Sequence, residues 1–277
     1  MFGYIPSPED KRDWKVENIF TSSHLPPKLD LSKDLEPVRD QRTFGTCVAM
    51  SLACMKEYQE ILDLKITGYL SPMYIYNQRC NKPEKGMHIR DAFKILKEYG
   101  IIREAYIRYG DETSPITKEM KELGKLYKID AYAQVETVEG LKQALYQQGL
   151  CIMAFPIYDY DYDGKRMWYK RTPDSKITSG HCVTVCGYDD NKKVEDRVGA
   201  FKIRNSWGEN WGPYNDGYSW FPYDDFDAIF SLEARLGEVW SSLDSDSGKP
   251  SVIFWLKNIF WKIMSQWPLK KIVQWVL

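Results

Sequence analysis

Helical and strand-like patterns occupy separate parts of this chain, and that separation limits the folds available to it. Apolar residues recur at helical spacing in three segments: Thr46–Leu64, Ile89–Tyr99 and Thr137–Gln148. Gly100 and Gly149 follow the last two segments, as glycines do at helix ends. Short apolar runs typical of strands come next: 151–158, 181–188, 201–205 and 217–221. Helices followed by strands predict an α+β protein with two lobes.

Composition divides the 277 residues into four regions. Residues 1–34 are rich in proline and are predicted to form an extended arm, which could be regulatory. Residues 35–240 form the predicted folded domain, with a helical lobe over about 35–135 and a β lobe over about 136–240. A polar linker rich in Ser and Asp is predicted over 241–250, and the region 251–277 is rich in Trp, Ile and Val.

The overall charge bears on the binding partners of the protein, and the cysteine content bears on the redox state of its compartment. A formal net charge of −1 gives no electrostatic reason to expect nucleic acid binding. Met1–Phe20 lacks the apolar core of a signal peptide, so we expect an intracellular protein. The six cysteines are then expected to be reduced thiols. Cys182 and Cys186 are four residues apart in one strand-like run, too far along it to bridge each other.

The C-terminal region Ser251–Leu277 has the pattern of a cationic amphipathic helix. Lys257 and Lys262 lie with polar residues on one side of a helical wheel, and apolar residues lie on the other until Pro268 interrupts the pattern. Such helices lie in the interface of a membrane, and this region contains four tryptophans. A terminal helix packed on the domain has the same pattern. We expect a membrane-associating tail, which would hold the protein at a membrane or package it in a virion.

The run from Gln41 to Cys47 places an amide six residues before a thiol that begins the first apolar helix. At a helix N-terminus the unsatisfied N–H groups and the helix dipole favour negative charge, so a thiolate is stabilised there. The Gln41 amide can loop back to help bind an oxyanion beside the sulfur. A buried helical cysteine without a chemical role is the simpler interpretation, and the rest of the chain decides between the two.

A cysteine nucleophile needs a general base, and the chain contains three histidines. His24 lies in the proline-rich arm, and His88 lies in a polar loop before a helix. His181 begins an apolar strand, which would hold its imidazole rigidly, and it follows Cys47 by 134 residues. We therefore predict that His181 is the base.

An amide that can orient this imidazole stands at the end of the next strand. Asn205 closes the run 201–205 and is followed by Ser206, Trp207 and Gly208. Its side chain can accept a hydrogen bond from the imidazole and fix the ring tautomer. Trp207 can cover that bond and exclude water, which strengthens it in the lower dielectric.

Together these motifs resemble the papain-like cysteine peptidases. The residues at the family's motif positions are Gln41, Gly45-Thr46-Cys47, Gly180-His181-Cys182-Val183 and Asn205-Ser206-Trp207-Gly208. The separation of Cys47 and His181 falls in the range of about 130–150 residues expected for such pairs. Ser71–Tyr76 and Gly86–Asp91 are also similar to the family. The likeness covers about residues 3–235 and is greatest to compact members from bacteria, archaea and large DNA viruses.

The resemblance implies a fold and a chemistry. The fold has a helical left lobe and an antiparallel, β-barrel-like right lobe, with the active-site cleft between them. The activity is that of an endopeptidase, in which Cys47 is the nucleophile, His181 the general base and acid, and Asn205 its orienting partner. Gln41 and the Cys47 backbone N–H would form the oxyanion hole. The candidate substrate-binding residues are Gly86, Met87 and Trp207. The resemblance implies protein or peptide substrates and no cofactor, and leaves the oligomeric state open.

The chain departs from the family at three places. Phe44 stands where secreted members place a disulfide cysteine, and Val48 stands where many relatives carry tryptophan after the nucleophile. We also expect no long helical pro-segment before the domain. We hypothesise that the arm Phe2–Trp14 lies across or near the cleft and restrains activity, because Tyr4-Ile5-Pro6 is an extended segment without a core of its own.

Alternative functions share these residues. A degenerate homologue would bind peptides without cleaving them, and a Cys–His acyltransferase or ligase would pass the acyl group to an amine. Metal binding is not expected at either of two suggestive clusters. Asp159–Gly164 begins like a calcium loop, but Lys170 stands where that loop has a bidentate glutamate. A zinc site at His181, Cys182 and Cys186 would lack a fourth ligand, and strand alternation turns His181 away from both thiols.

Overall fold

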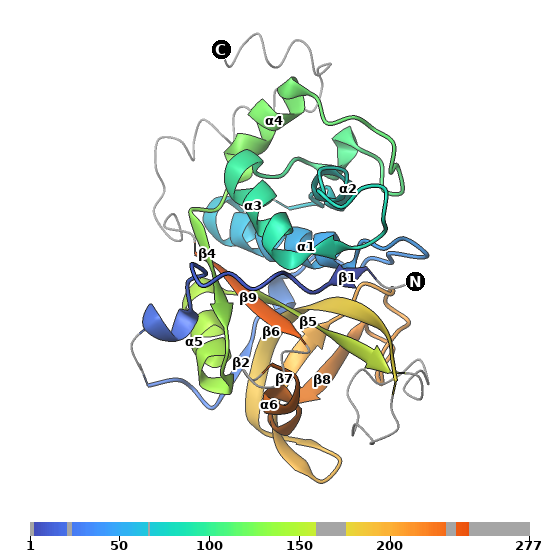
Figure 1. The fold of residues 1–277 in the computed structure, drawn as a ribbon. Coiled ribbons are helices and arrows are strands. Elements are labelled where there is room, and N and C mark those ends of the chain that lie inside the picture. The colour runs from blue at the N-terminus through green and yellow to red at the C-terminus, as the bar shows by residue number, and fades with distance from the viewer. Residues whose placement is uncertain (1–2, 21–23, 66, 159–175, 231–236, 244–277) are drawn as a thin grey trace.

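The computed structural model describes residues 3–20, 24–65, 67–158, 176–230 and 237–243. It has an α+β architecture, in which helices α1–α4 form one lobe and an antiparallel sheet forms the other (Figure 1). One cluster of buried apolar side chains joins the helices to one face of the sheet, and a second lies on the opposite face. The run Asp159–Gly164, which begins like a calcium loop but was not expected to bind metal, and the tail Ser251–Leu277 lie outside the described residues.

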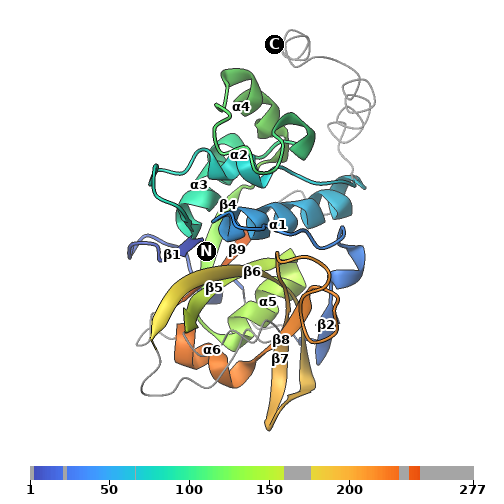
Figure 2. The ribbon, with the colours of Figure 1, turned by 90° about the vertical axis from the view of Figure 1, so that its right-hand side faces the viewer.

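Helix α1 spans Cys47–Leu64 and runs between the two lobes (Figures 1 and 2). It contains neither glycine nor proline, and all its residues from 47 to 60 are buried, as expected for a helix with packed elements around it. Its buried charges are paired, since Lys56 and Glu60 form an ion pair of 2.9 Å one turn apart. The helix ends where Lys65 adopts a left-handed conformation. This central helix fixes the position of Cys47 relative to the sheet.

The remaining helices and short turns are arranged around α1 and the sheet. In the helical lobe they are α2 (Pro72–Tyr76), α3 (Ile89–Tyr99) and α4 (Lys118–Gly124). Helices α5 (Val138–Gln148) and α6 (Tyr223–Phe230) pack on the sheet face opposite α1. Four 3₁₀ turns are η1 (Val16–Asn18), η2 (Ser32–Asp34), η3 (Glu104–Tyr106) and η4 (Lys125–Tyr127). Among the described helices, none has both the length and the apolar composition needed to cross a membrane.

The sheet has the strand order β4-β9-β5-β6-β7-β8, and β2 also pairs with β6. Its strands are β2 (Lys28–Asp30), β4 (Ala131–Val135), β5 (Cys151–Tyr158), β6 (Ile177–Val194), β7 (Arg197–Arg204), β8 (Tyr218–Pro222) and β9 (Glu238–Leu243). All of these pairs are antiparallel. Within the described strands, β4 and β8 lie at opposite ends of the order and do not pair, so the sheet of the predicted barrel-like lobe is not closed into a barrel.

The strongest sequence patterns are confirmed as elements. The three predicted helices correspond to α1, α3 and α5, and the four predicted strands to β5, β6, β7 and β8. The arm contains more structure than an extended segment, because β1 (Tyr4–Ile5) pairs in parallel with β3 (Met87–His88) and β2 joins the sheet. Strand β9 continues to Leu243, so the first residues of the predicted linker lie in the sheet.

Candidate active site

Cys47 is the first residue of α1, and its thiol is fully buried. Burial raises the pKa of this thiol to about 11, because the thiolate would lose its hydration. The backbone N–H groups of Gly3, Cys182 and Val48 face the sulfur and oppose that rise in pKa. Cys182 directly follows His181 on β6, so the thiol lies next to the strand that carries the predicted base. The structure thus brings together the start of α1 and strand β6, which carries His181, although the two are far apart in sequence.

His181 is buried on β6 and bonds to Asn205, the residue just after β7. The distance from His181 Nε2 to Asn205 Oδ1 is 2.8 Å. The same oxygen accepts the Ser206 backbone N–H at 2.8 Å, which identifies it as the amide oxygen because an N–H can only donate. Nε2 must therefore be the protonated nitrogen of the neutral ring, and Nδ1 is the basic one. Burial lowers the pKa of His181 to about 4, although its bond to Asn205 partly opposes this.

Trp207 lies against the imidazole and is partly buried. The centroids of the His181 and Trp207 rings are 4.5 Å apart, with 31° between the planes. Trp211 packs edge-on against Trp207 at 5.6 Å. The two indoles therefore shield the His181–Asn205 hydrogen bond from water, the shielding that the sequence predicted for Trp207.

Gln41 is buried in the loop before α1, where it bonds to Ser206 just beyond the end of β7. Its side-chain oxygen accepts the Ser206 hydroxyl at 2.6 Å, and its Nε2 donates to the Phe44 carbonyl at 2.9 Å. The backbone is fixed as well, because the Gln41 N–H donates to the Ser206 carbonyl at 2.7 Å. An amide nitrogen has two N–H groups, so one bond to Phe44 leaves the second for an oxyanion beside Cys47. Ser206, which orients this amide, was not assigned a role from the sequence.

The N-terminal arm passes directly through the site. The Gly3 carbonyl accepts the Met87 backbone N–H at 2.8 Å, and Tyr4 and Ile5 then pair with Met87 and His88. The approach is so close that a Cβ on Gly3 would come within 2.0 Å of the Gly45 carbonyl oxygen. Gly86 also lies against the arm, since a Cβ there would meet the Gly3 oxygen at 3.0 Å. Two of the predicted substrate-binding residues, Gly86 and Met87, therefore contact the arm.

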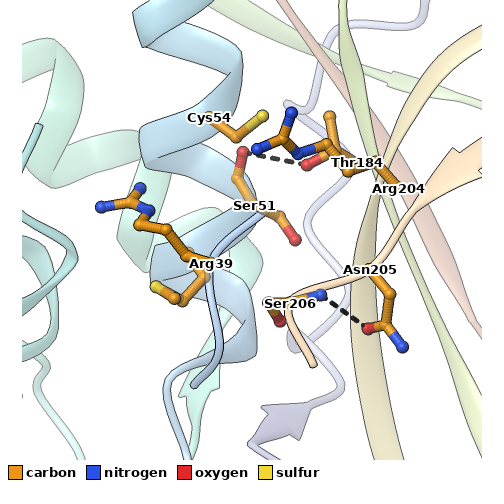
Figure 3. Close-up of a pocket in the computed structure, with 8 residues that line it drawn as sticks. Arg39, Ser51, Cys54, Thr184, Arg204, Asn205 and Ser206 are labelled. Atoms are coloured by element: carbon orange, nitrogen blue, oxygen red, sulfur yellow. Dashed lines mark hydrogen bonds between the residues drawn. The ribbon is translucent and has the colours of Figure 1, made fainter. Parts of the chain in front are cut away.

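A small cavity lies behind the site, between α1 and strands β6 and β7 (Figure 3). Asn205 and Ser206 form one wall, and Arg39, Cys54, Thr184 and Arg204 contribute to the rest. Arg204 donates to the Pro37 carbonyl at 2.7 Å and to the Tyr218 hydroxyl at 3.1 Å. Arg39 pairs with Glu57 of α1 at 2.9 Å and with Glu104 at 2.7 Å. These buried and partly buried charges hold the loop before Gln41 between the two lobes.

A thiol at a helix start, beside a sheet that carries an imidazole–amide pair, is the architecture of a cysteine peptidase. The model of the papain family cysteine protease matches residues 25–226, and the chain belongs to that family.

Individual relatives agree with this assignment. The chain is 26% identical over 260 residues to an uncharacterized peptidase C1-like protein of Acanthamoeba polyphaga mimivirus, covering 80% of this chain and 81% of that protein. It is 28% identical over 224 residues to mouse cathepsin J, covering 75% of this chain and 64% of the cathepsin. Among solved structures, xylellain, a cysteine protease from Xylella fastidiosa, superposes with a TM-score of 0.73 at 28% identity. The superposition covers 88% of this chain and 96% of xylellain.

Proposed function

We propose that this papain-family protein is an active endopeptidase that uses Cys47, His181 and Asn205 as a catalytic triad. The observation that carries the proposal is the 2.8 Å hydrogen bond between His181 and Asn205. This bond orients the imidazole and makes Nδ1 its basic nitrogen. The position of Cys47 at a helix start supports its role as the nucleophile, since a thiolate is stabilised there once water can reach it.

The reaction would proceed through an acyl-enzyme. His181 Nδ1 takes the thiol proton, and the Cys47 thiolate attacks the peptide carbonyl carbon. The oxyanion that forms accepts hydrogen bonds from Gln41 Nε2 and the Cys47 backbone N–H. The imidazolium gives its proton to the leaving amine as the C–N bond breaks. A water molecule, deprotonated by His181, then attacks the thioester, and the thiolate leaves as the acid product forms.

The arm would keep this enzyme at rest. While Gly3–Ile5 lies beside Cys47 and β3, an extended substrate has no access to the same strand. The pKa values of about 11 for Cys47 and about 4 for His181 also keep both groups neutral at pH 7. Release of the arm would admit water, move both pKa values toward neutrality and permit the thiolate–imidazolium pair.

Cys47→Ala is the direct test. We expect the peptidase activity of this variant to be at least about 10⁴-fold lower than that of the parent, because no other group replaces the nucleophile. A thiol-directed epoxide should label Cys47 of the parent protein, as mapped by mass spectrometry. Cys80→Ala is the matched control, since this exposed thiol contacts Asp91 at 2.7 Å, away from the site. Equal cleavage by Cys47→Ala and the parent would refute the proposal.

An amine acceptor distinguishes hydrolysis from acyl transfer. A hydrolase should yield free acid when a peptide and an excess of amine are supplied together, whereas a ligase or transferase should yield the conjugate. A protein that binds the peptide but releases neither product would be the degenerate homologue.

A further inference from the structure

Residues 41–46, which we call the oxyanion loop, hold the two donors of the proposed oxyanion hole at their two ends. Gln41 supplies its side-chain amide, and the peptide bond that follows Thr46 carries the Cys47 N–H. Within the loop, Arg42 has a φ of 53°, a left-handed conformation that is unfavourable for residues other than glycine. Backbone of this kind keeps its shape where contacts from the surrounding structure hold it.

Tyr109 supplies such a contact from the helical lobe, where it lies between η3 and α4. Its hydroxyl donates to the Gln41 backbone carbonyl at 2.9 Å, and the same oxygen lies 2.8 Å from Thr46 Oγ1. The phenol has one proton, which it gives to the carbonyl, so the Thr46 hydroxyl must donate to the phenol oxygen. One oxygen of Tyr109 therefore bonds to both ends of the oxyanion loop.

Thr46 shows that this bond replaces an ordinary helix cap. Thr46 is the N-cap residue of α1 and is buried, but its side chain makes no cap bond to the helix. A threonine at this position usually accepts a hydrogen bond from an N–H of the first helical turn. Because the Thr46 hydroxyl bonds to Tyr109 instead, it does not occupy the N–H groups beside Cys47.

The Tyr109 side chain is itself held in place. Its ring packs edge-on against Phe44, with the centroids 5.7 Å apart and 80° between the planes. Gly110 leaves room for Phe44, since a Cβ at Gly110 would come within 3.2 Å of the Phe44 Cζ atom. Asn77 Nδ2 donates to the Asp111 carbonyl at 2.9 Å and so fixes the backbone after Tyr109. The phenol oxygen is thus a fixed point to which the oxyanion loop is attached.

We propose that Tyr109 is a positioning residue of the oxyanion hole, and that its hydroxyl sets the distance between the Gln41 amide and the Cys47 backbone N–H. This inference rests on the proposed function, because it concerns the oxyanion hole of the same site. Donors placed for an oxyanion stabilise the transition state more than the bound substrate. Loss of the Tyr109 hydroxyl should therefore lower kcat and leave KM nearly unchanged.

Tyr109→Phe is the test, because it removes the hydroxyl and keeps the ring that packs on Phe44. The change is made in Gly3→Val, a chain whose arm cannot dock because a branched side chain would overlap the Gly45 carbonyl. With a fluorogenic peptide we expect kcat to fall about 10–100-fold, less than the loss of a whole donor would cause. Alkylation of Cys47 by iodoacetamide forms no oxyanion and should keep its rate. A general loosening of the site would instead slow both reactions.

Two further variants show whether the effect belongs to the oxyanion hole. Tyr146→Phe is the matched control, since Tyr146 lies on α5, is 50% exposed and should affect neither reaction. In Gln41→Ala the donor is already absent, so addition of Tyr109→Phe should lower kcat by less than about threefold. An unchanged kcat in Tyr109→Phe, equal slowing of hydrolysis and alkylation, or fully additive losses with Gln41→Ala would overturn the inference and leave the peptidase proposal intact.

The side-chain amide of Gln41 gives a measurement that does not require hydrolysis. Its nitrogen bonds to the Phe44 carbonyl and its oxygen to the Ser206 hydroxyl, so its ¹⁵N–¹H signals should be sharp. These signals are identified in the full chain by their absence from Gln41→Ala. Tyr109→Phe should shift and broaden them, and Tyr146→Phe should not. If this is found but the parent protein cleaves no peptide, the positioning inference stands and the proposed activity fails. Unchanged signals in Tyr109→Phe would refute the inference directly.

Discussion

Asn205 controls the His181 ring through a single oxygen that accepts two hydrogen bonds. The Ser206 backbone N–H holds the amide in one orientation, and the amide in turn fixes the imidazole tautomer. Because Trp207 covers the pair, the bond forms in a region of low dielectric, where its geometry has a larger energetic effect. The orientation of the imidazole thus depends on Asn205, Ser206 and Trp207.

Asn205→Ala should therefore reduce kcat more than it changes KM. We expect a fall in kcat of about 100-fold when the change is made in Gly3→Val, a chain whose arm cannot dock because a branched side chain would overlap the Gly45 carbonyl. The reason for the fall is that the imidazole loses its orientation. Asn191→Ala is the control, since this exposed amide lies on β6 away from the site. A pH–rate profile should also shift, because the Asn205 bond raises the pKa of His181. Unchanged kcat and an unchanged profile would exclude an orienting role.

The pKa of His181 predicts how acid affects the docked arm. Burial lowers this pKa to about 4, whereas a hydrated imidazole has a value of about 6.5. Between these values the undocked chain binds one proton more than the docked chain, so falling pH favours undocking by about tenfold per pH unit. Above pH 6.5 the imidazole is neutral in both forms and the dependence should vanish.

Hydrogen exchange at the Met87 amide measures this equilibrium, since that N–H bonds to Gly3 when the arm is docked. Protection, corrected for the intrinsic exchange rate, should fall between pH 6.5 and 4 in a Cys47→Ala chain. The same chain with His181→Gln should lose the dependence. An equal slope in both proteins would show that His181 is not the group responsible.

At the scale of elements, the short pairing of β1 with β3 is what we expect to restrain the enzyme. Gly3→Val should undock β1 and raise kcat/KM at least about tenfold, because the competent form becomes the main population. Lys11→Val tests whether any change in the arm has this effect, since Lys11 is exposed and should leave the activity as it is. Unchanged activity in Gly3→Val and in a chain lacking residues 1–14 would contradict restraint by the arm.

The sequence predicted the long elements well and missed the short or unusual ones. Helices α1, α3 and α5 have clear periodicity and ends, and each begins and ends within a residue of its predicted bounds. Strand β9 was missed because Ser241 and Ser242 are typical of a linker. Both are fully buried, and their hydroxyls bond to the protein, with Gln59 donating to Ser242 at 2.7 Å. Partners of this kind, distant in sequence, are invisible to a local pattern.

At the scale of the whole molecule, a local pattern again does not show contacts between residues that are distant in sequence. This separates the part of the site that was predicted from the part that was missed. Cys47, His181, Asn205 and Gln41 each stand in a recognisable local motif, so the sequence alone was enough to propose them. Glu238 of β9 accepts a hydrogen bond from Tyr4 of the arm, 234 residues away, and neither stands in such a motif. Their contact exists only after the arm has crossed between the two lobes. The chemical groups were therefore predictable, whereas the contact between the arm and β9 was not.

The tail Ser251–Leu277, which follows the described residues, gives a prediction about the location of the whole protein. Its pattern of lysines opposite tryptophans and aliphatic residues is typical of a helix that lies on an anionic membrane. The full chain should therefore float with vesicles containing phosphatidylserine, and a chain lacking the tail should not.

A double change within the full chain tests the electrostatic part of this prediction. Lys257→Gln with Lys262→Gln should weaken vesicle binding by about 30-fold, since each lysine near such a surface contributes about 1 kcal/mol. Lys11→Gln with Lys176→Gln removes the same charge from exposed positions outside the tail and should have little effect. If the full chain and the tailless chain stay with the soluble fraction alike, the tail is not a membrane anchor. Its apolar side must then pack against protein, because exposed tryptophans and aliphatic residues would otherwise favour aggregation.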